Sequence, residues 1–230
     1  MFEKKFSALN ISGTYDLCEI EKIEDLEIFL DKNSDFTGFN VTVPYKKSIL
    51  PYLDYIDSHA KAIGAVNTVK IIRTTDGQIS LSGYNTDWSG FLETLRTFDL
   101  TRIKRAVILG TGGASKAVAY ALTQLGIKTT FVSRTEKDNV ITYQNLTKDT
   151  FDAHQLIINT TPLGMYPDTE DAPHIPYEYI KAEHICYDLI YNPGVTEFLS
   201  RCSNQGATIK NGFEMLIRQA EKAWEIWSRR

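Results

Sequence analysis

The sequence predicts an α/β fold with mainly parallel sheets, and three observations support this prediction. Short apolar runs alternate with stretches whose apolar residues recur every three to four positions, as strands alternating with helices do. A glycine cluster follows one of the apolar runs and precedes a helix-like stretch. The chain has 230 residues, 43% of them hydrophobic, which is enough for one large or two small globular domains.

The residue pattern of the first third of the chain predicts strands that alternate with helices. The turn residues Thr75, Asp76 and Gly77 separate two apolar runs, so we expect a hairpin there. The expected elements are a strand over 15–20, a helix over 23–30, a buried strand over 38–43 that ends at Pro44, a helix over 55–63, and hairpin strands over 67–72 and 79–84.

The remainder continues the alternation. Trp88, Phe91, Leu92 and Leu95 recur at helical spacing and predict the next helix. Further strands are expected over 106–109, 129–132, 156–158, 185–189 and 208–209. We therefore predict a front α/β unit over residues 1–86, a second unit over 87–210, a cleft between them, and a terminal helix over 211–230 that packs back on the front unit.

Composition excludes several classes of protein. The formal net charge of −4 provides no broad attraction to nucleic acid or to an anionic membrane. The sequence shows no membrane-spanning apolar run and no signal-peptide core, so a cytoplasmic location is expected. Cys18, Cys186 and Cys202 lack CxxC spacing and are interpreted as reduced thiols. The four histidines are scattered, so no metal site is expected.

The glycine cluster Gly110, Gly112 and Gly113 predicts a dinucleotide site. It lies in a strand–turn–helix–strand context, which is what makes such a cluster meaningful. The glycines let the backbone approach a pyrophosphate, and the first N–H groups of the next helix point at that anion. The second unit is therefore expected to be a Rossmann-like doubly wound domain. The alternative is a tight strand–helix connection that binds nothing.

The strand after this helix ends in Ser133, Arg134 and Thr135. Proteins specific for NAD usually place an acid at this position to bind the ribose hydroxyls, whereas an arginine favours the additional phosphate of NADP. We therefore expect NADP, with NAD as the less favoured alternative. Glu136 is close by and could compete with the phosphate.

Lys46 and Lys47 follow the buried strand that ends at Pro44. Proline suits the first turn of a helix, so both lysines are expected in that turn, where the helix dipole disfavours a cation by about 0.3–1 kcal/mol. A residue that breaks a local preference is a functional candidate, and the positive helix end would lower a lysine pKa towards the range of a general acid or base. The alternative is a pair of solvated surface lysines.

Three polar residues have a functional and a structural interpretation. Asp87 falls where a strand meets a helix, and could simply cap that helix. Asn67 enters a strand from a Gly-Ala turn and could be an ordinary turn residue. Gln219 shares the apolar face of the last helix, where an amide without a partner costs about 1–3 kcal/mol. It makes a structural hydrogen bond, lies at a partly exposed edge, or contacts a ligand in a cleft. The expected apolar stripe comprises Phe213, Leu216, Ala220, Ala223 and Trp227.

Together these motifs resemble the shikimate dehydrogenase family over nearly the whole chain. The shared motifs are NVTVPYK at 40–46, GAVNT at 64–68, GYNTD at 83–87, GTGGAS at 110–115, NTTPLGM at 159–165, YNP at 191–193 and GFEMLIRQA at 212–220. The resemblance implies reversible NADPH-dependent reduction of 3-dehydroshikimate to shikimate, a step in aromatic amino acid (chorismate) biosynthesis.

The resemblance also implies roles for individual residues. Lys46 would be the catalytic acid/base and Asp87 its partner, with Thr42, Asn67, Tyr191 and Gln219 binding the substrate. The cofactor pyrophosphate would be held by Gly110, Gly112, Gly113, Ala114 and Ser115. Its ribose phosphate would be held by Ser133, Arg134 and Thr135. Thr160, Met165 and Gly212 would lie near its nicotinamide. The implied partners are small molecules, and the implied assembly is a monomer or a homodimer.

One family feature is not found in the sequence. The family normally opens with a strand and a GxPxxHSxSP loop whose serines bind the substrate carboxylate, and Ser7 and Ser12 lack that context. Either the natural protein has residues before Met1, or the chain has lost the serines that bind the carboxylate. In the second case it is a weak enzyme or a non-catalytic NADP-binding regulatory protein. An NAD-preferring quinate/shikimate enzyme is a further alternative. Ser133 also replaces the asparagine that is common in the family.

Overall fold

The computed structural model describes residues 1–75 and 77–228, and it confirms the predicted α/β fold. The chain divides into two compact units, residues 1–36 and residues from Thr37 onward. The domain boundaries that we predicted near residues 86 and 210 stay predictions. Within the described residues, no helix combines the length and the apolar character that crossing a membrane requires.

The first unit contains two helices, α1 (Phe2–Leu9) and α2 (Leu26–Lys32), with a 3₁₀ turn at Ile23–Asp25 before α2. Leu26 and Leu30 are buried, as expected for the apolar face of the predicted helix over 23–30. The strand predicted over residues 15–20 is wrong, because this segment has no regular structure. Leu17 is 98% exposed, so the apolar side chains that suggested a strand are not packed against a core.

The smaller sheet belongs to the second unit and contains the predicted hairpin. Its strands are ordered β1 (Gly38–Asn40), β3 (Thr68–Arg73), β4 (Ile79–Tyr84) and β2 (Tyr55–Ile56). Strands β3 and β4 pair antiparallel, which places Thr68 opposite Tyr84. The helix predicted over 55–63 is shorter: α3 (Ser58–Ile63) starts after β2, and the Asp57 carboxylate accepts hydrogen bonds from its first N–H groups.

The helix predicted to begin at Pro44 does not form. The strand β1 ends at Asn40, and residues 43–49 form turns before a 3₁₀ turn at Leu50–Tyr52. Backbone bonds to a distant segment hold this region: Val41 N donates to Asn67 O at 2.8 Å, and Val66 N donates to Lys46 O at 2.8 Å. Lys46 therefore does not lie at the positive end of a helix, and the helix-dipole argument for its reactivity is wrong.

The larger sheet is entirely parallel among the described residues, and has the order β10-β9-β8-β5-β6-β7. Counted along the chain this is the Rossmann strand order, in which the topological switch point lies between β5 and β8. The strand β7 was not predicted. The strands are β5 (Arg105–Leu109), β6 (Lys128–Ser133), β7 (Val140–Thr142), β8 (Leu156–Asn159), β9 (Ile185–Asp188) and β10 (Thr208–Lys210).

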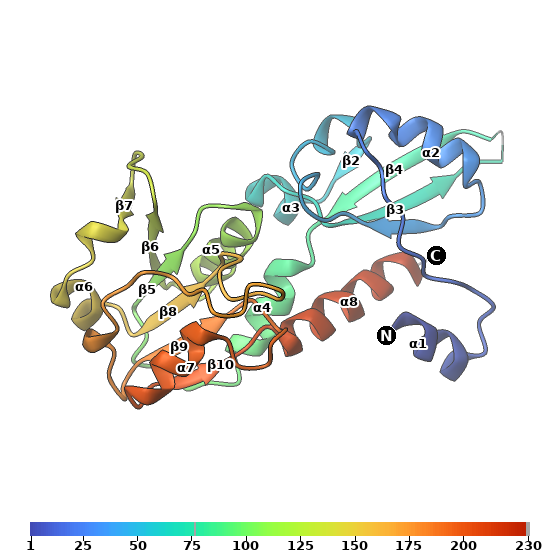
Figure 1. Cartoon of the computed structure of the whole chain (residues 1–230). Coiled ribbons are helices and arrows are strands. Elements are labelled where there is room, and N and C mark those ends of the chain that lie inside the picture. The colour runs from blue at the N-terminus through green and yellow to red at the C-terminus, as the bar shows by residue number, and fades with distance from the viewer. Residues whose placement is uncertain (76, 229–230) are drawn as a thin grey trace. The chain divides into compact units, whose positions relative to one another are not determined.

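Helices cover both faces of this sheet (Figure 1). On one face, Ile108, Ile158 and Tyr187 pack against α4 (Asp87–Leu95), α5 (Gly113–Gln124) and α8 (Phe213–Ser228). On the other face, Val107 and Ile157 pack with residues of α6 (Lys148–Ala153) and α7 (Glu197–Asn204). Successive strand residues thus enter different cores, which explains why these strands are apolar without interruption.

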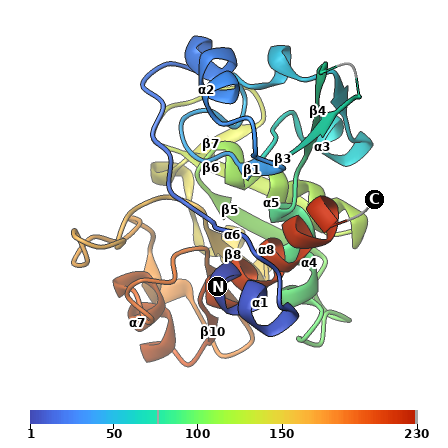
Figure 2. The same ribbon diagram turned by 90° about the vertical axis from the view of Figure 1, so that its right-hand side faces the viewer.

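Helices α4 and α8 lie side by side in both ribbon views (Figures 1 and 2). They approach closely at Gly90, where an added Cβ would stand 2.9 Å from the Gln219 backbone nitrogen. The buried face of α8 differs from the predicted stripe. Phe213 is 54% exposed, whereas Met215 and Ile226 join Ala220 and Ala223 inside. Near its end, Trp227 Nε1 donates to Val69 O of β3 at 2.9 Å.

Candidate active site

Lys46 and Asp87 form an ion pair although they are 41 residues apart in the sequence. Lys46 Nζ donates to Asp87 Oδ2 at 2.7 Å, and the two side chains are 20% and 11% exposed. A partly buried pair is screened less by salt than a surface pair is. Lys46 is therefore not one of two independently solvated lysines, which was the alternative interpretation of its sequence.

Asp87 does not cap the helix that it begins. The capping oxygen belongs to Asn85, whose Oδ1 accepts from the backbone N–H groups of Asp87 and Trp88 at 3.1 and 3.4 Å. The Asp87 carboxylate remains available to side chains, and its second oxygen accepts from Asn67 Nδ2 at 2.9 Å. Asn85 was not singled out in the sequence, although an Asn two residues before a helix is a recognisable cap.

Asn67 is buried at 3% exposure and has bonds through both ends of its amide. Its Oδ1 accepts from Thr86 N at 2.7 Å, while its Nδ2 donates to Asp87. The amide is therefore oriented by the backbone at the start of α4, and it presents its donor to the carboxylate. This arrangement is more specific than an ordinary turn residue requires.

Gln219 reaches the same cluster from α8. Its Oε1 accepts from Thr86 Oγ1 at 3.3 Å and from Asn67 Nδ2 at 3.5 Å, and its Nε2 donates to Leu216 O at 3.2 Å. Its long, bifurcated contacts suit an amide that can exchange a protein partner for a ligand hydroxyl. The close α4–α8 approach at Gly90 brings this side chain into range.

Two predicted substrate residues lie outside this hydrogen-bonded cluster of Lys46, Asp87, Asn67 and Gln219. Thr42 is exposed at the start of the turn that contains Lys46, and its carbonyl accepts from Tyr45 N at 2.9 Å. Tyr191 lies in the loop after β9 with 49% of its surface exposed. Their assignment to substrate stays a prediction.

The glycine turn lies at the switch point of the larger sheet. Gly110 has a φ of 106°, which favours glycine, and an added Cβ would stand 2.8 Å from Thr160 Oγ1 at the end of β8. Among the described residues, no atom beyond the adjoining backbone lies within 4 Å of a Cβ added at Gly112 or Gly113. This open space at the start of α5 fits a phosphate group bound to backbone N–H groups.

The neighbouring residues reinforce the turn. Ser115 is buried and its Oγ donates to Gly112 O at 2.7 Å, which ties the first turn of α5 to the glycines. Thr160 Oγ1 donates to Leu109 O at 2.6 Å, so the ends of β5 and β8 are joined. Ala114 lies between Gly113 and Ser115 in the same first turn.

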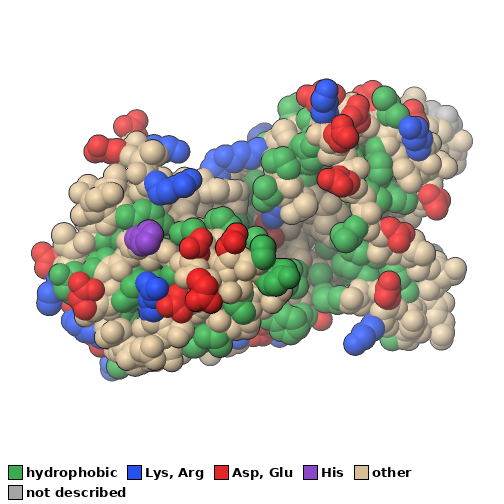
Figure 3. Space-filling model, in the orientation of Figure 1, with side chains coloured by type: hydrophobic (Ala, Val, Ile, Leu, Met, Phe, Trp, Pro, Cys, Tyr) green, Lys and Arg blue, Asp and Glu red, His purple; other side chains and the backbone are tan. Residues whose placement is uncertain are grey.

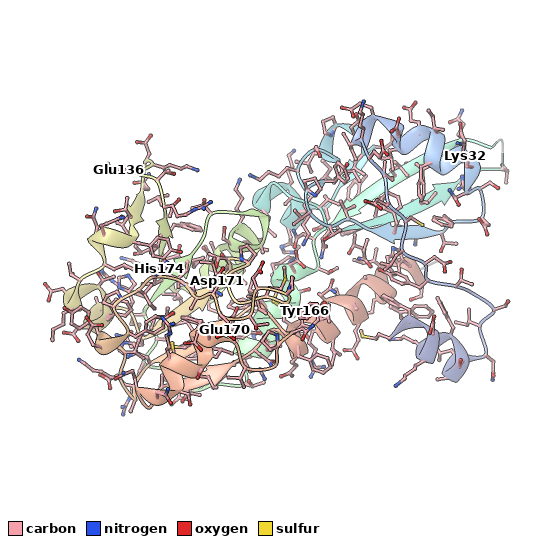
Figure 4. The ribbon with its side chains drawn as sticks, viewed as in Figure 1. Lys32, Glu136, Tyr166, Glu170, Asp171 and His174 are labelled. Atoms are coloured by element: carbon pink, nitrogen blue, oxygen red, sulfur yellow. The ribbon has the colours of Figure 1, made fainter. Side chains whose placement is uncertain are left out.

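The end of β6 presents charges of both signs. Arg134 and Thr135 are exposed, and Thr135 N donates to Ser133 Oγ at 3.4 Å. Glu136 stands at the outer end of the connection between β6 and β7 (Figure 4), where acidic and basic side chains lie together on the surface (Figure 3). Burial raises the pKa of Tyr143, and the guanidinium of Arg134 opposes that rise.

Met165 and Gly212, predicted near the nicotinamide, lie in two different loops. Met165 is 49% exposed in the loop after β8, next to Tyr166, which Figure 4 labels. Gly212 is buried after β10, its N donates to Ile190 O at 3.0 Å, and a side chain there would collide with Leu189 O. Gly212 therefore serves close backbone packing between two loop ends.

Lys116 was missed by the sequence analysis. It lies in the first turn of α5, and the nearby ammonium of Lys47, followed by burial, lowers the pKa of Lys116. The backbone explains why Lys116 lies near Lys47. Ala117, which follows Lys116, packs with Ala65, and Val66 N, which follows Ala65, donates to Lys46 O. Because a cation in a first helical turn breaks local preference, the rule that drew attention to Lys46 could have identified Lys116.

Comparisons with known proteins agree with this geometry. A sequence model of the shikimate dehydrogenase substrate binding domain matches residues 1–69. A shikimate dehydrogenase (NADP(+)) of Methanosphaera stadtmanae is 37% identical, and the match covers 99% of this chain and 85% of that protein. The crystal structure of the Aquifex aeolicus shikimate dehydrogenase has a TM-score of 0.83 at 34% identity and 99% and 85% coverage.

A further structure was determined with ligands. The shikimate 5-dehydrogenase of Thermus thermophilus, in complex with NADP(H) and shikimate, has a TM-score of 0.82 at 31% identity, and the match covers 97% of this chain and 85% of that one. The chain is thus similar, over nearly its whole length, to shikimate dehydrogenases from three organisms.

Proposed function

The chain belongs to the shikimate dehydrogenase family, and from this we propose that it catalyses the reversible NADPH-dependent reduction of 3-dehydroshikimate to shikimate. The observation that carries the proposal is the 2.7 Å pair of Lys46 and Asp87, to which Asn67 adds a hydrogen bond. An ammonium, a carboxylate and an amide within hydrogen-bonding reach of one another are suited to proton transfer at a substrate oxygen.

Lys46 would act on the oxygen of the substrate ketone. When bound, the nicotinamide supplies the hydride, and the ketone oxygen gains negative charge. The Lys46 ammonium would stabilise that charge and donate a proton to the oxygen, while Asp87 holds the ammonium in place. In the reverse direction the same lysine would accept the proton. Asn67 fixes the carboxylate, because its amide is itself held by Thr86 N.

The remaining polar groups would orient the substrate. Gln219 and Asn67 are proposed to bind its hydroxyls, since the long contacts between them leave hydrogen-bonding capacity. Thr42 and Tyr191 are proposed to contact the substrate from exposed positions. Orientation of this kind converts binding energy into rate, because reactive groups must be placed to within about 1 Å.

The larger, parallel sheet and its loops support the proposed cofactor site. The turn of Gly110, Gly112 and Gly113, with Ala114 and Ser115, would bind the pyrophosphate. Ser133, Arg134 and Thr135 would bind the ribose phosphate, and Thr160, Met165 and Gly212 would lie beside the nicotinamide. The support is the positive φ of Gly110, the open space over the next two glycines and the exposed guanidinium of Arg134.

The test is an absorbance assay of the chain with NADP and shikimate, following formation of NADPH. We expect turnover with NADP and a lower kcat/KM with NAD. The variant Lys46→Ala should lose turnover by about 10²–10⁴-fold, the usual contribution of a general acid or base, while NADPH affinity is retained. Lys61→Ala, at an exposed position on α3, is the control. Near-normal turnover of Lys46→Ala would refute the assignment of that lysine.

A non-catalytic NADP-binding protein is the alternative from another class. It predicts that NADPH fluorescence titration shows binding while shikimate produces no reduction of NADP. Titration and turnover on the same preparation therefore distinguish the two functions.

A further inference from the structure

Asp188 is a fully buried carboxylate at the end of β9, outside the cluster of Lys46, Asp87, Asn67 and Gln219. Burial raises its pKa to about 6, and hydrogen bonds from Thr196, Ile190 and Asn159 oppose that rise. The groups that contact the carboxylate carry no formal charge: a side-chain amide on β8, a backbone N–H in the loop after β9, and a hydroxyl at the start of α7.

The bonds to Asp188 are well formed. Its Oδ1 accepts from Asn159 Nδ2 at 3.1 Å and from Ile190 N at 3.0 Å, and its Oδ2 accepts from Thr196 Oγ1 at 2.6 Å. A single carboxylate therefore joins the ends of two neighbouring strands, β8 and β9, to the first turn of a helix. These are the carboxyl ends of parallel strands, where ligands bind in this class of sheet.

The branch through Asn159 leads to the loop after β8. Asn159 Oδ1 accepts from Thr161 N at 3.0 Å and from Thr161 Oγ1 at 2.7 Å. Thr160, which contacts the glycine turn, lies between these two anchored residues, and Met165 follows in the same loop. The position of Asn159 thus determines where the loop beside the proposed nicotinamide site begins.

The branch through Ile190 leads to the loop after β9. Asp188 holds Ile190 N, and Ile190 O accepts from Gly212 N at 3.0 Å, immediately before α8. Tyr191 is the next residue. The two loops are also joined to each other, because Tyr166 N donates to Asn192 O at 3.2 Å. Four residues of these two loops are proposed to contact the nicotinamide or the substrate. Each is adjacent in sequence to a residue that is hydrogen-bonded in this network, or is bonded in it itself: Thr160, Met165, Tyr191 and Gly212.

Stability alone does not explain a charge at this position. Burying a carboxylate without a cationic partner is unfavourable. What the carboxylate provides is two oxygens that accept three donors from three elements at once.

We propose that Asp188 is a positioning residue, which holds the loops after β8 and β9 in one arrangement so that cofactor and substrate are aligned. This inference rests on the proposed function of the site. It assigns no proton transfer to Asp188 and no contact with either ligand.

The test compares Asp188→Asn with Asp188→Leu. Asparagine keeps the acceptor for Asn159 and Ile190, and its amide nitrogen can donate to Thr196 Oγ1, so we expect kcat and both KM values within about threefold of wild type. Leucine has similar size but accepts nothing. For Asp188→Leu we expect kcat to fall about 10- to 100-fold and the KM for NADPH to rise, as misplacement of about 1 Å would produce.

Thr196→Val is the matched control. It removes the third bond to the same carboxylate and the side-chain cap of α7, where Thr196 Oγ1 accepts from Leu199 N at 3.3 Å. It leaves the bonds of Asp188 to Asn159 and Ile190, which lead to the loops after β8 and β9. We expect a lower melting temperature with kcat and KM near wild type. Equal kinetic loss in Thr196→Val and Asp188→Leu would show that general destabilisation, not positioning, explains the effect, and would overturn the inference.

Thr161→Val keeps the inference testable if Asp188→Leu does not fold. Thr161 is only partly buried, and the substitution removes the bond from its hydroxyl to Asn159. A rise in the KM for NADPH without a loss of thermal stability is expected, and an unchanged KM would contradict the inference. If wild type binds NADPH without reducing the substrate, the proposed function fails, and NADPH affinity of the same variants still decides the role of Asp188.

Discussion

Asp87 and Asp188 are both mostly buried aspartates, one at the start of α4 and the other at the end of β9, yet their surroundings differ. Asp87 accepts from an ammonium at 2.7 Å and keeps 11% of its side chain exposed. Asp188 is fully buried and its contacts are an amide, a hydroxyl and a backbone N–H. A carboxylate paired with an ammonium can take part in proton transfer, whereas one surrounded by neutral donors is suited to hold backbone in place. The identity of the partner, more than burial, separates the two proposed roles.

The same substitution at both positions should have unequal effects, and this is the largest difference we expect. Asp87→Asn removes the charge that holds Lys46, so kcat should fall by about 10²-fold or more. Asp188→Asn should leave kcat within about threefold, because its acceptor geometry is kept. Steady-state NADPH absorbance measures both. Similar losses in the two variants would end the distinction between a reacting pair and an anchor.

The stability of the protein should depend on pH through Asp188. Its pKa rises from 3.8 to about 6 on folding, so the native state binds this proton more tightly than the unfolded state. The stability from this group is therefore complete below pH 3.8 and is lost as pH rises through about 6, by about 3 kcal/mol.

Urea unfolding of wild type and Asp188→Asn between pH 4 and 7.5 measures this contribution. The difference in free energy of unfolding should shift in favour of the variant as pH rises, because asparagine does not titrate. A difference that is constant over this range would show that the carboxyl pKa is not raised.

The contact between β5 and β8 provides a test at the glycine turn. Gly110→Ala places a Cβ 2.8 Å from Thr160 Oγ1 at a φ of 106°, so it should cost about 1–3 kcal/mol of stability and weaken NADPH binding about tenfold. Gly126→Ala, at a φ of 71° with open space around the Cβ, is the matched control for backbone strain. Equal loss of NADPH affinity in both variants would contradict a specific role of the turn.

The smallest effect is expected at Lys116, whose neighbour is another cation instead of a carboxylate. Lys116→Met should weaken NADPH binding about two- to fivefold, because a partly exposed ion pair with a ligand phosphate contributes at most about 1 kcal/mol, and kcat should not change. Titrations at low and high salt should show the difference shrinking with salt. A loss of kcat equal to that of Asp87→Asn would show that Lys116 belongs with the reacting pair.

Elements with a strong local pattern were predicted well. The hairpin of β3 and β4, the strand–turn–helix from β5 to α5, and α4 follow from turn residues and apolar spacing, which act over a few neighbours. Lys46, Asp87, Asn67 and Gln219 were named as candidates from their motifs, and the structure brings them together. The strand over 15–20 was wrong, because its apolar side chains are not packed against a core. The helix after Pro44 and the buried face of α8 were wrong, because distant hydrogen bonds and packing override the local pattern there.

The sequence by itself determined the alternation of strands and helices and the position of the glycine turn, since both depend on residues close together along the chain. Tertiary structure decided which cation meets which carboxylate, that Asn85 caps α4 so that Asp87 is left for Lys46, and that Asp188 is buried among neutral donors. The reason is physical: a hydrogen bond between residues 41 positions apart depends on how the intervening segments pack, and no local pattern encodes that distance.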